Sequence, residues 1–324
     1  DLVDLESECI DRILGKIDRD PEDLETKSRE KELWQKIKVF NDEGRRTGTG
    51  ITAIGDCLAA LNIKYGSEES IEKTEEIYKT LKLACYRSSV EMSKLLGPFK
   101  DWDPELEKNS PFLKRIKKED KVLYDDMNKH GRRNISLLTT APTGTVSTLT
   151  QTSSGIEPIF MLSYVRRKKI NPGDKNTKID FVDQLGDKWQ EFDVYHHKVL
   201  DWKRITGEDD VKKSPWWGAC AEDINWVNRV KLQAAAQKHV CHGISSTLNL
   251  PENVSVEEVK QIYQTAAKEG LKGVTIYRKN CRSGVLIESK EDKFDKQPES
   301  LPCEIFETKI KGENYFVLVG INNN

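Results

Sequence analysis

Residues 134–147 read Asn134-Ile-Ser-Leu-Leu-Thr-Thr-Ala-Pro-Thr-Gly-Thr-Val-Ser147 and combine an apolar run with a turn of small residues. Residues 135–141 are short, apolar and β-branched, which is typical of a strand covered on both faces. Pro142 ends such a strand, and Gly144 allows a ligand to approach the backbone closely. We expect a helix to begin at Thr145 and run to Gln151.

The turn that follows this run predicts a site for an anion. The first N–H groups of the expected helix have no partner within it, and the hydroxyls of Thr143, Thr145 and Ser147 would converge on the same ligand. An ordinary strand-ending turn has the same spacing, so that alternative stays open. No Lys follows the second small residue, which excludes a Walker A loop.

A strand–helix–strand unit is predicted near the end of the chain. Residues 244–250 alternate like a strand, and Ser255-Val-Glu-Glu258 has the pattern of a capping box that opens a helix. Gly270 is suited to the position after the last helical turn, and residues 271–277 predict the next strand. Such a unit pairs its strands in parallel, so the sequence predicts the α/β class.

Helices are expected over most of the remaining chain. The apolar spacing in residues 1–44 predicts two outer helices separated at Asp20-Pro21. The glycine-dense segment 44–55 leads to a short apolar helix at residues 56–61. Further predicted helices are a long one from the N-cap Ser67 to Gly97-Pro98, a helical excursion at 99–133, and tryptophan-bearing helices in 180–240.

Composition excludes several classes of protein. The 324 residues carry a formal net charge of −2 and are 36% hydrophobic, which argues against a dedicated binder of nucleic acid or of a membrane surface. No apolar run has the length of a transmembrane helix, and no signal peptide is recognisable. Seven scattered cysteines without a C-x-x-C pattern indicate a reducing, cytoplasmic location. Both ends of the chain are expected to be cut.

Three other groups of residues are candidates for a site. The cations of residues 166–169 favour a solvated face, with the mouth of an anionic ligand site as the alternative. A metal site at His239-Val-Cys241-His242 is disfavoured because neighbouring side chains point apart, and His196-His197 is expected to be a surface pair. Cys281 is expected to pack against its neighbours, although its cationic setting would suit a reactive thiol. No metal site follows.

Four ordered motifs then resemble one known family. They are Arg132–Ser147, Ser154-Gly-Ile-Glu-Pro158, Ile244–Pro251 and Gly270–Arg278, and in that order they are similar to the C-terminal half of the ribonucleotide reductase catalytic chain. Residues 44–56 and 64–69 extend the resemblance toward the N-terminus. Residues 277–286 and 301–305 look most like the vitamin B12-dependent, class II branch. Thr49 and Cys241-His242-Gly243 depart from the usual family pattern.

The resemblance implies a fold for the chain and a division of the chain into domains. Residues 1–287 would be the second half of a ten-stranded α/β barrel with extra surface helices. Residues 288–300 would be a charged linker, and residues 301–324 would be two strands that begin a truncated accessory domain. The family's Asn-x-Cys-x-Glu radical loop does not occur in this sequence. No catalytic residue is therefore identifiable, and we expect this fragment alone to be inactive.

The resemblance also implies the chemistry. The family converts ribonucleoside di- or triphosphates to 2′-deoxyribonucleotides, the precursors for DNA replication, by a thiyl-radical mechanism. It implies substrate phosphate binding at six residues: Pro142, Thr143, Gly144, Thr145, Val146 and Ser147. Adenosylcobalamin is the implied cofactor, because Tyr277 precedes Arg278 and not the second tyrosine of the class I radical relay. A thioredoxin-like reductant and a homodimer are the implied partners.

Two other functions stay open. One is the class I large subunit, which carries out the same reaction with a metal-bearing radical partner. The other is a non-catalytic nucleotide-binding module that retains the phosphate turn. The sequence does not distinguish a diphosphate from a triphosphate substrate, because both would present phosphates to the same turn.

Overall fold

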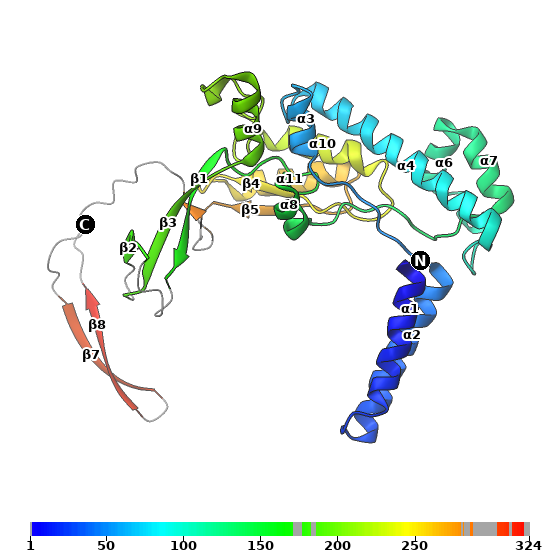
Figure 1. The fold of residues 1–324 in the computed structure, drawn as a ribbon, viewed down its shortest axis with the longest axis horizontal. Coiled ribbons are helices and arrows are strands. Elements are labelled where there is room, and N and C mark those ends of the chain that lie inside the picture. Colours follow the sequence, from blue (N-terminus) through cyan, green and yellow to red (C-terminus); the bar gives the residue numbers. More distant parts are fainter. Residues whose placement is uncertain are drawn as a thin grey trace. The chain divides into compact units, whose positions relative to one another are not determined.

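The computed structural model describes residues 2–170, 177–182, 186–279, 281, 286–287, 303–310 and 313–320 (Figure 1). The chain divides into two compact units, Asp1–Ile287 and Glu288–Asn324. The predicted linker at 288–300 lies outside the described residues. Within the second unit, β7 (Cys303–Ile310) and β8 (Glu313–Gly320) pair in an antiparallel hairpin, so the expectation of two strands after residue 301 is confirmed.

The helices predicted in the first hundred residues are present. They are α1 (Leu2–Ile17), α2 (Leu24–Gly44), α3 (Ile54–Ala60) and α4 (Glu68–Leu96). The side chain of Ser67 accepts a hydrogen bond from Ser70 N, and Gly97 ends α4 with a φ of 79°. These ends follow from capping chemistry, because a hydroxyl replaces a missing helical acceptor and glycine tolerates positive φ.

The middle and the end of the first unit are also largely helical. The expected excursion at 99–133 contains α5 (Pro104–Glu107), α6 (Pro111–Glu119) and α7 (Lys121–His130). Later helices are α8 (Gly144–Thr150), α9 (His197–Thr206), α10 (Trp226–Gln237) and α11 (Val256–Lys268), with a 3₁₀ turn at Val211–Lys213. In the described part of the chain, no helix is long and apolar enough to cross a membrane.

The predicted strand–helix–strand unit is confirmed. β4 (Thr247–Leu250) and β5 (Thr275–Arg278) pair in parallel, and α11 connects them. Ser255 Oγ accepts a hydrogen bond from Glu258 N at 3.1 Å, and Gly270 has a φ of 77°. Leu248 and Leu250 are buried against α10 and α11, whereas Thr247 and Asn249 lie on the other face of the strand. The α/β class follows from this parallel pair.

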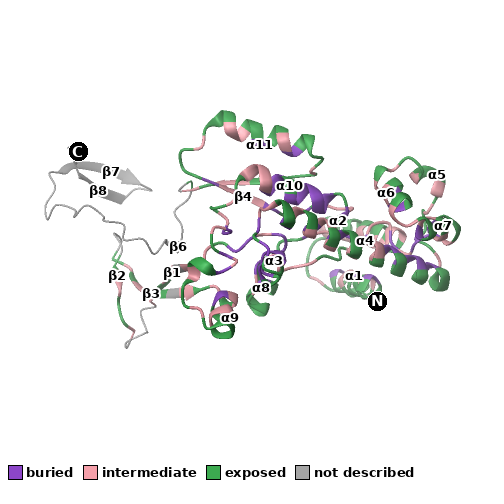
Figure 2. Cartoon of the chain, turned by 90° about the horizontal axis from the view of Figure 1, so that it is seen from above, coloured by how far each residue is buried: buried purple, intermediate pink, exposed green. Residues whose placement is uncertain are grey.

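Residues 135–141 differ from the continuous strand that we expected. They form isolated parallel bridges, Thr49 with Leu138 and Thr140 with Ile244. A Cβ on Gly50 would lie 2.3 Å from the carbonyl oxygen of Thr139, so the two segments approach more closely than a side chain would allow. The apolar run is still buried as predicted, with Leu137 and Leu138 in the main core beside α3, α4 and α10, where Figure 2 shows buried residues gathered.

The segment 181–195 contradicts our expectation of helices throughout 180–240. β1 (Ser163–Lys169), β2 (Phe181–Val182), β3 (Lys188–Tyr195) and β6 (Leu286–Ile287) form an antiparallel sheet in the order β2-β3-β1-β6. Cross-strand side-chain contacts stabilise this sheet: the Arg167 guanidinium lies 3.9 Å from the centre of the Phe181 ring and pairs with Glu191 at 2.8 Å. These contacts depend on partners distant in sequence, which local spacing does not reveal.

Candidate functional site

The predicted turn opens α8, which begins at Gly144, one residue earlier than expected. Thr143 does not cap the helix with its side chain. Its Oγ1 instead lies 2.8 Å from Thr52 Oγ1 and 3.1 Å from Ser154 Oγ. Gly155 N donates to the hydroxyls of Thr52 and Thr143 at 3.0 and 2.9 Å. This hydroxyl network fixes the start of α8 against two other segments of the chain.

The turn is open to solvent on the side of its backbone. Pro142, Gly144, Thr145 and Val146 are exposed, and a Cβ placed on Gly144 would meet no atom within 4 Å. Ser147 is buried, and its hydroxyl donates to Gly144 O at 2.9 Å. The structure therefore brings the six predicted residues together but engages the Thr143 and Ser147 hydroxyls within the protein. The N–H groups of the first helical turn are the donors that the turn can still offer to a ligand.

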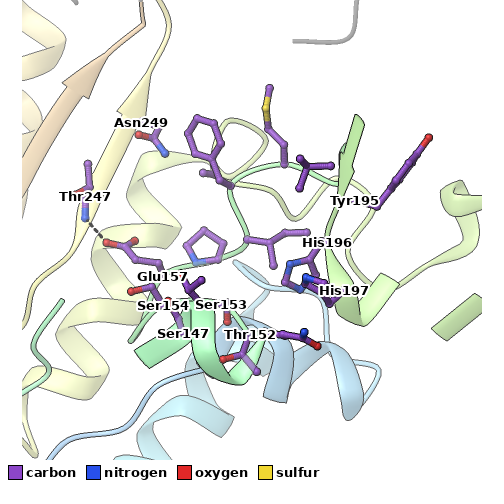
Figure 3. A pocket seen from close by; sticks show the side chains of 18 of the residues that line it. Ser147, Thr152, Ser153, Ser154, Glu157, Tyr195, His196, His197, Thr247 and Asn249 are labelled. Carbon is purple, nitrogen blue, oxygen red and sulfur yellow. Dashed lines mark hydrogen bonds between the residues drawn. The ribbon is translucent and has the colours of Figure 1, made fainter. Parts of the chain in front are cut away.

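A cleft of about 610 Å³ lies beside the C-terminal half of α8 (Figure 3). Ser147 belongs both to the predicted turn and to the wall of the cleft, and Ser154 links the cleft to Thr143. Figure 3 shows His196 and His197 on one side and Thr247 and Asn249 of β4 on the other. The other residues that line the cleft are Thr148, Gln151, Thr152, Ser153, Glu157, Pro158, Ile159, Phe160, Met161, Arg166, Val194, Tyr195 and Ala221.

The contact between Asp56 and His196 is a functional candidate that sequence reasoning missed. The buried Asp56 carboxylate accepts hydrogen bonds from Ser153 N at 2.7 Å and Trp216 Nε1 at 2.9 Å, and it lies 2.7 Å from His196 Nε2. Burial acts to raise the pKa of Asp56, but the hydrogen bond and charge of His196, with the other bonds, outweigh it and lower that pKa. Because the His196 side chain is only 14% exposed, the expected surface pair with His197 is wrong.

Glu157 links the segment that lines the cleft to β4 and α10 through its carboxylate. One carboxylate oxygen accepts a hydrogen bond from Thr247 N at 2.8 Å, and the other pairs with the buried guanidinium of Arg229. Arg229 also bonds Tyr65, whose hydroxyl donates to Ile156 O at 2.6 Å. Burial raises the pKa of Tyr65, so it stays a neutral donor. The negative charge of Glu157 in the wall of the cleft is thus paired with the positive charge of Arg229.

Three of the four cations at residues 166–169 divide into two groups. Arg167 pairs with Glu191, and Lys169 pairs with Asp187. Arg166 is exposed, lines the cleft and forms no ion pair with any residue that the structure describes. Arg167 and Lys169 therefore belong to the expected solvated face, whereas Arg166 lies in a cleft wall, and a role of Arg166 at an anionic ligand stays a prediction.

The remaining candidates lead to no site. His239 is buried, and Cys241 Sγ accepts hydrogen bonds from Leu137 N and Leu138 N at 3.2 and 3.1 Å. Among the residues with described positions, no group of three His, Cys, Asp or Glu side chains could hold a metal ion. Cys281 is exposed, so the expectation that it packs against its neighbours is wrong.

Comparison with known proteins identifies the architecture. Residues 29–277 match the family model described as "Ribonucleotide reductase, barrel domain". A vitamin B12-dependent ribonucleoside-diphosphate reductase of Mycobacterium tuberculosis strain CDC 1551 / Oshkosh is 27% identical over 263 residues, which cover 77% of this chain and 33% of the relative. A Thermoplasma acidophilum protein of the same name is 27% identical over 257 residues, covering 77% of this chain and 30% of the relative.

A solved structure shows partial similarity. The Actinobacillus ureae class Id ribonucleotide reductase alpha subunit aligns with a TM-score of 0.49 at 21% identity, covering 75% of this chain and 41% of that one. The chain spans about a third of the length of the curated relatives that it matches.

Proposed function

The chain belongs to the ribonucleotide reductase barrel-domain family, and on that premise we propose that it positions the substrate phosphates in a ribonucleotide reductase. The observation that supports this assignment is the exposed start of α8, held in place by the hydroxyls of Thr52, Thr143 and Ser154. Backbone N–H groups at a helix start favour an anion by hydrogen bonding and by the helix dipole. The reaction of the whole enzyme would convert ribonucleotides to 2′-deoxyribonucleotides.

In this proposal the chain binds and orients the substrate, and residues outside it carry the radical. No Asn-x-Cys-x-Glu pattern occurs in the 324 residues. β4 and β5 would be two adjacent strands of a ten-stranded barrel to which residues 1–287 contribute the second half. Thr247 and Asn249 of β4 line the cleft, so the barrel interior would be on that face of the strand. We expect the isolated chain to form no deoxynucleotide.

Adenosylcobalamin is the proposed cofactor because relatives are named as vitamin B12-dependent reductases. The succession Tyr277-Arg278 supports it, since a class I relay would need a second tyrosine there. The described cavities of about 610 and 680 Å³ have the size of sites for ordinary small ligands, and neither is assigned to the cofactor. No step is therefore assigned to the cofactor through these residues.

The class I large subunit is the alternative of the same reaction. Activity of the complete gene product with adenosylcobalamin, and with no second subunit, would exclude it. Dependence on a metal-bearing partner subunit would overturn the class II assignment. A ribonucleoside di- or triphosphate as substrate, a thioredoxin-like reductant, a homodimer and a cytoplasmic location complete the proposal.

Replacement of Gly144 by Val tests the phosphate site directly. The added side chain would enter open space and so would not disturb packing, but it would obstruct a phosphate at the first helical turn. We expect the affinity for pyrophosphate, measured by calorimetry on the 324-residue chain, to fall at least tenfold. Leu149→Ala, at an exposed position on the same helix, should leave it unchanged. Equal pyrophosphate affinity of the Gly144→Val variant and the original chain would count against the site.

A further inference from the structure

One nitrogen of His196 is fixed by the protein. Its Nε2 lies 2.7 Å from Oδ1 of Asp56, the same oxygen that accepts from Trp216 Nε1, while Ser153 N donates to the other oxygen. The hydrogen bonds that converge on Asp56 keep it an ionised carboxylate near neutral pH, and a carboxylate can only accept. Nε2 of His196 therefore carries the hydrogen of this bond.

The other nitrogen is available to a ligand. When Nε2 donates, Nδ1 of a neutral imidazole is a hydrogen-bond acceptor. No described residue forms a hydrogen bond with Nδ1 of His196. Some buried polar atoms of the protein lack a partner, such as both nitrogens of His239, but Nδ1 of His196 does not belong to that group. Because His196 also lines the 610 Å³ cleft, this acceptor is open to whatever the cleft contains.

The position of the cleft favours the nucleoside part of a nucleotide. The cleft begins at Ser147, which lies about 4.5 Å along the axis of α8 from Gly144. A ligand with its phosphates on the first turn of α8 would thus extend its other end into the cleft. Near neutral pH the phosphates of a nucleotide are mainly hydrogen-bond acceptors, whereas ribose hydroxyls and base amino groups can donate.

We propose that His196 contacts the substrate by accepting, at Nδ1, a hydrogen bond from a hydroxyl or amino group of the nucleoside. Asp56 is the positioning residue, because it acts only through the His196 ring. His197 lines the same cleft but is exposed at the start of α9, and the structure gives it no bond to Asp56. This inference rests on the phosphate site proposed at residues 142–147.

The test uses calorimetric titration of the full 324-residue chain with ADP and with pyrophosphate. The amide nitrogen of a His196→Gln variant can still donate to Asp56, but its acceptor oxygen does not occupy the position of Nδ1. We expect this variant to bind ADP about tenfold more weakly and pyrophosphate equally well, which is the loss of one hydrogen bond. Asp56→Asn should produce the same selective loss, and the control His130→Gln, at a histidine that does not line the cleft, should change neither affinity.

Further titrations separate the sources of the contact. IDP lacks the exocyclic amino group of ADP, so an equal loss for ADP and IDP assigns the contact to a ribose hydroxyl, and a loss for ADP alone assigns it to the base. If His196→Gln binds ADP normally while Gly144→Val weakens both ligands, the His196 inference is overturned and the phosphate site stands. A parallel loss of pyrophosphate binding or a lowered melting temperature in His196→Gln also overturns it. If the original chain binds neither ligand, the proposed function itself fails.

Discussion

At the scale of single residues, His239 is the side chain whose environment most opposes its charge. Its ring is 2% exposed, and neither nitrogen has a hydrogen-bond partner. Glu75 of α4 and Glu119 of α6 lie 3.7 and 3.9 Å away, while Lys82 of α4 pairs with Glu119 and Lys238 with Glu75. Burial, with the nearby charge of Lys82, lowers the pKa of His239 to about 4. The folded protein therefore keeps this ring neutral.

A pH dependence of stability follows from His239. In the unfolded chain the His239 ring becomes protonated below its ordinary pKa of about 6.5. In the folded chain the same ring stays neutral down to about pH 4. The free energy of unfolding should therefore decrease as the pH is lowered through this window, by about 2 kcal/mol from pH 7 to pH 5. Urea unfolding of a His239→Leu variant should show a smaller decrease. His197→Gln is the control, and an unchanged decrease in the His239 variant would contradict the assignment.

Sequence reasoning located only part of the site at this scale. The turn at 142–147 could be identified because a proline, a glycine and three hydroxyls lie within six residues. Asp56 and His196 are separated by 140 positions, and the residues around each one do not indicate the other. Their contact is created by the tertiary fold, so a single sequence cannot reveal it.

At the scale of secondary-structure elements, local chemistry predicted the helices well and one sheet poorly. The capping pattern at Ser255 and the glycine at 270 fixed both ends of α11, because each acts within a few residues. The antiparallel sheet at 163–195 was missed. Its stability depends on cross-strand partners such as Arg167 and Glu191. The aromatic residues Trp189, Phe192 and Tyr195 recur every third position, as they would on one face of a helix.

The N-cap of α11 provides a test at this scale. Ser255 Oγ accepts a hydrogen bond from Glu258 N, and Ser255→Ala leaves that N–H without its acceptor. We expect the free energy of unfolding to fall by about 1 kcal/mol, whereas Ser255→Asp, also a good N-cap, should change it by only a few tenths. Chemical denaturation measures both variants. A loss in Ser255→Asp as large as in Ser255→Ala would show that the hydroxyl acts by another contact.

At the scale of the whole molecule, parallel contacts join segments far apart in the sequence. Thr49 bridges to Leu138, Thr140 bridges to Ile244, and β4 pairs with β5. The predicted α/β class holds because each short apolar segment is followed by a helix that returns the chain in the same direction. The order of these segments in space could not be predicted from residue patterns, since apolar segments of similar length do not encode which one pairs with which.

The division at Ile287 makes a prediction for the complete chain. Asp1–Ile287 contains the described cleft, the turn at 142–147 and the β6 strand that pairs with β1. A chain that ends at Ile287 should therefore keep its melting temperature and its pyrophosphate affinity, because removal of residues 288–324 takes away no contact described for the site. Differential scanning calorimetry and titration of the two chain lengths measure this. A drop in melting temperature of several degrees, which for a protein of this size corresponds to more than 1 kcal/mol, would mean that the second unit stabilises the first.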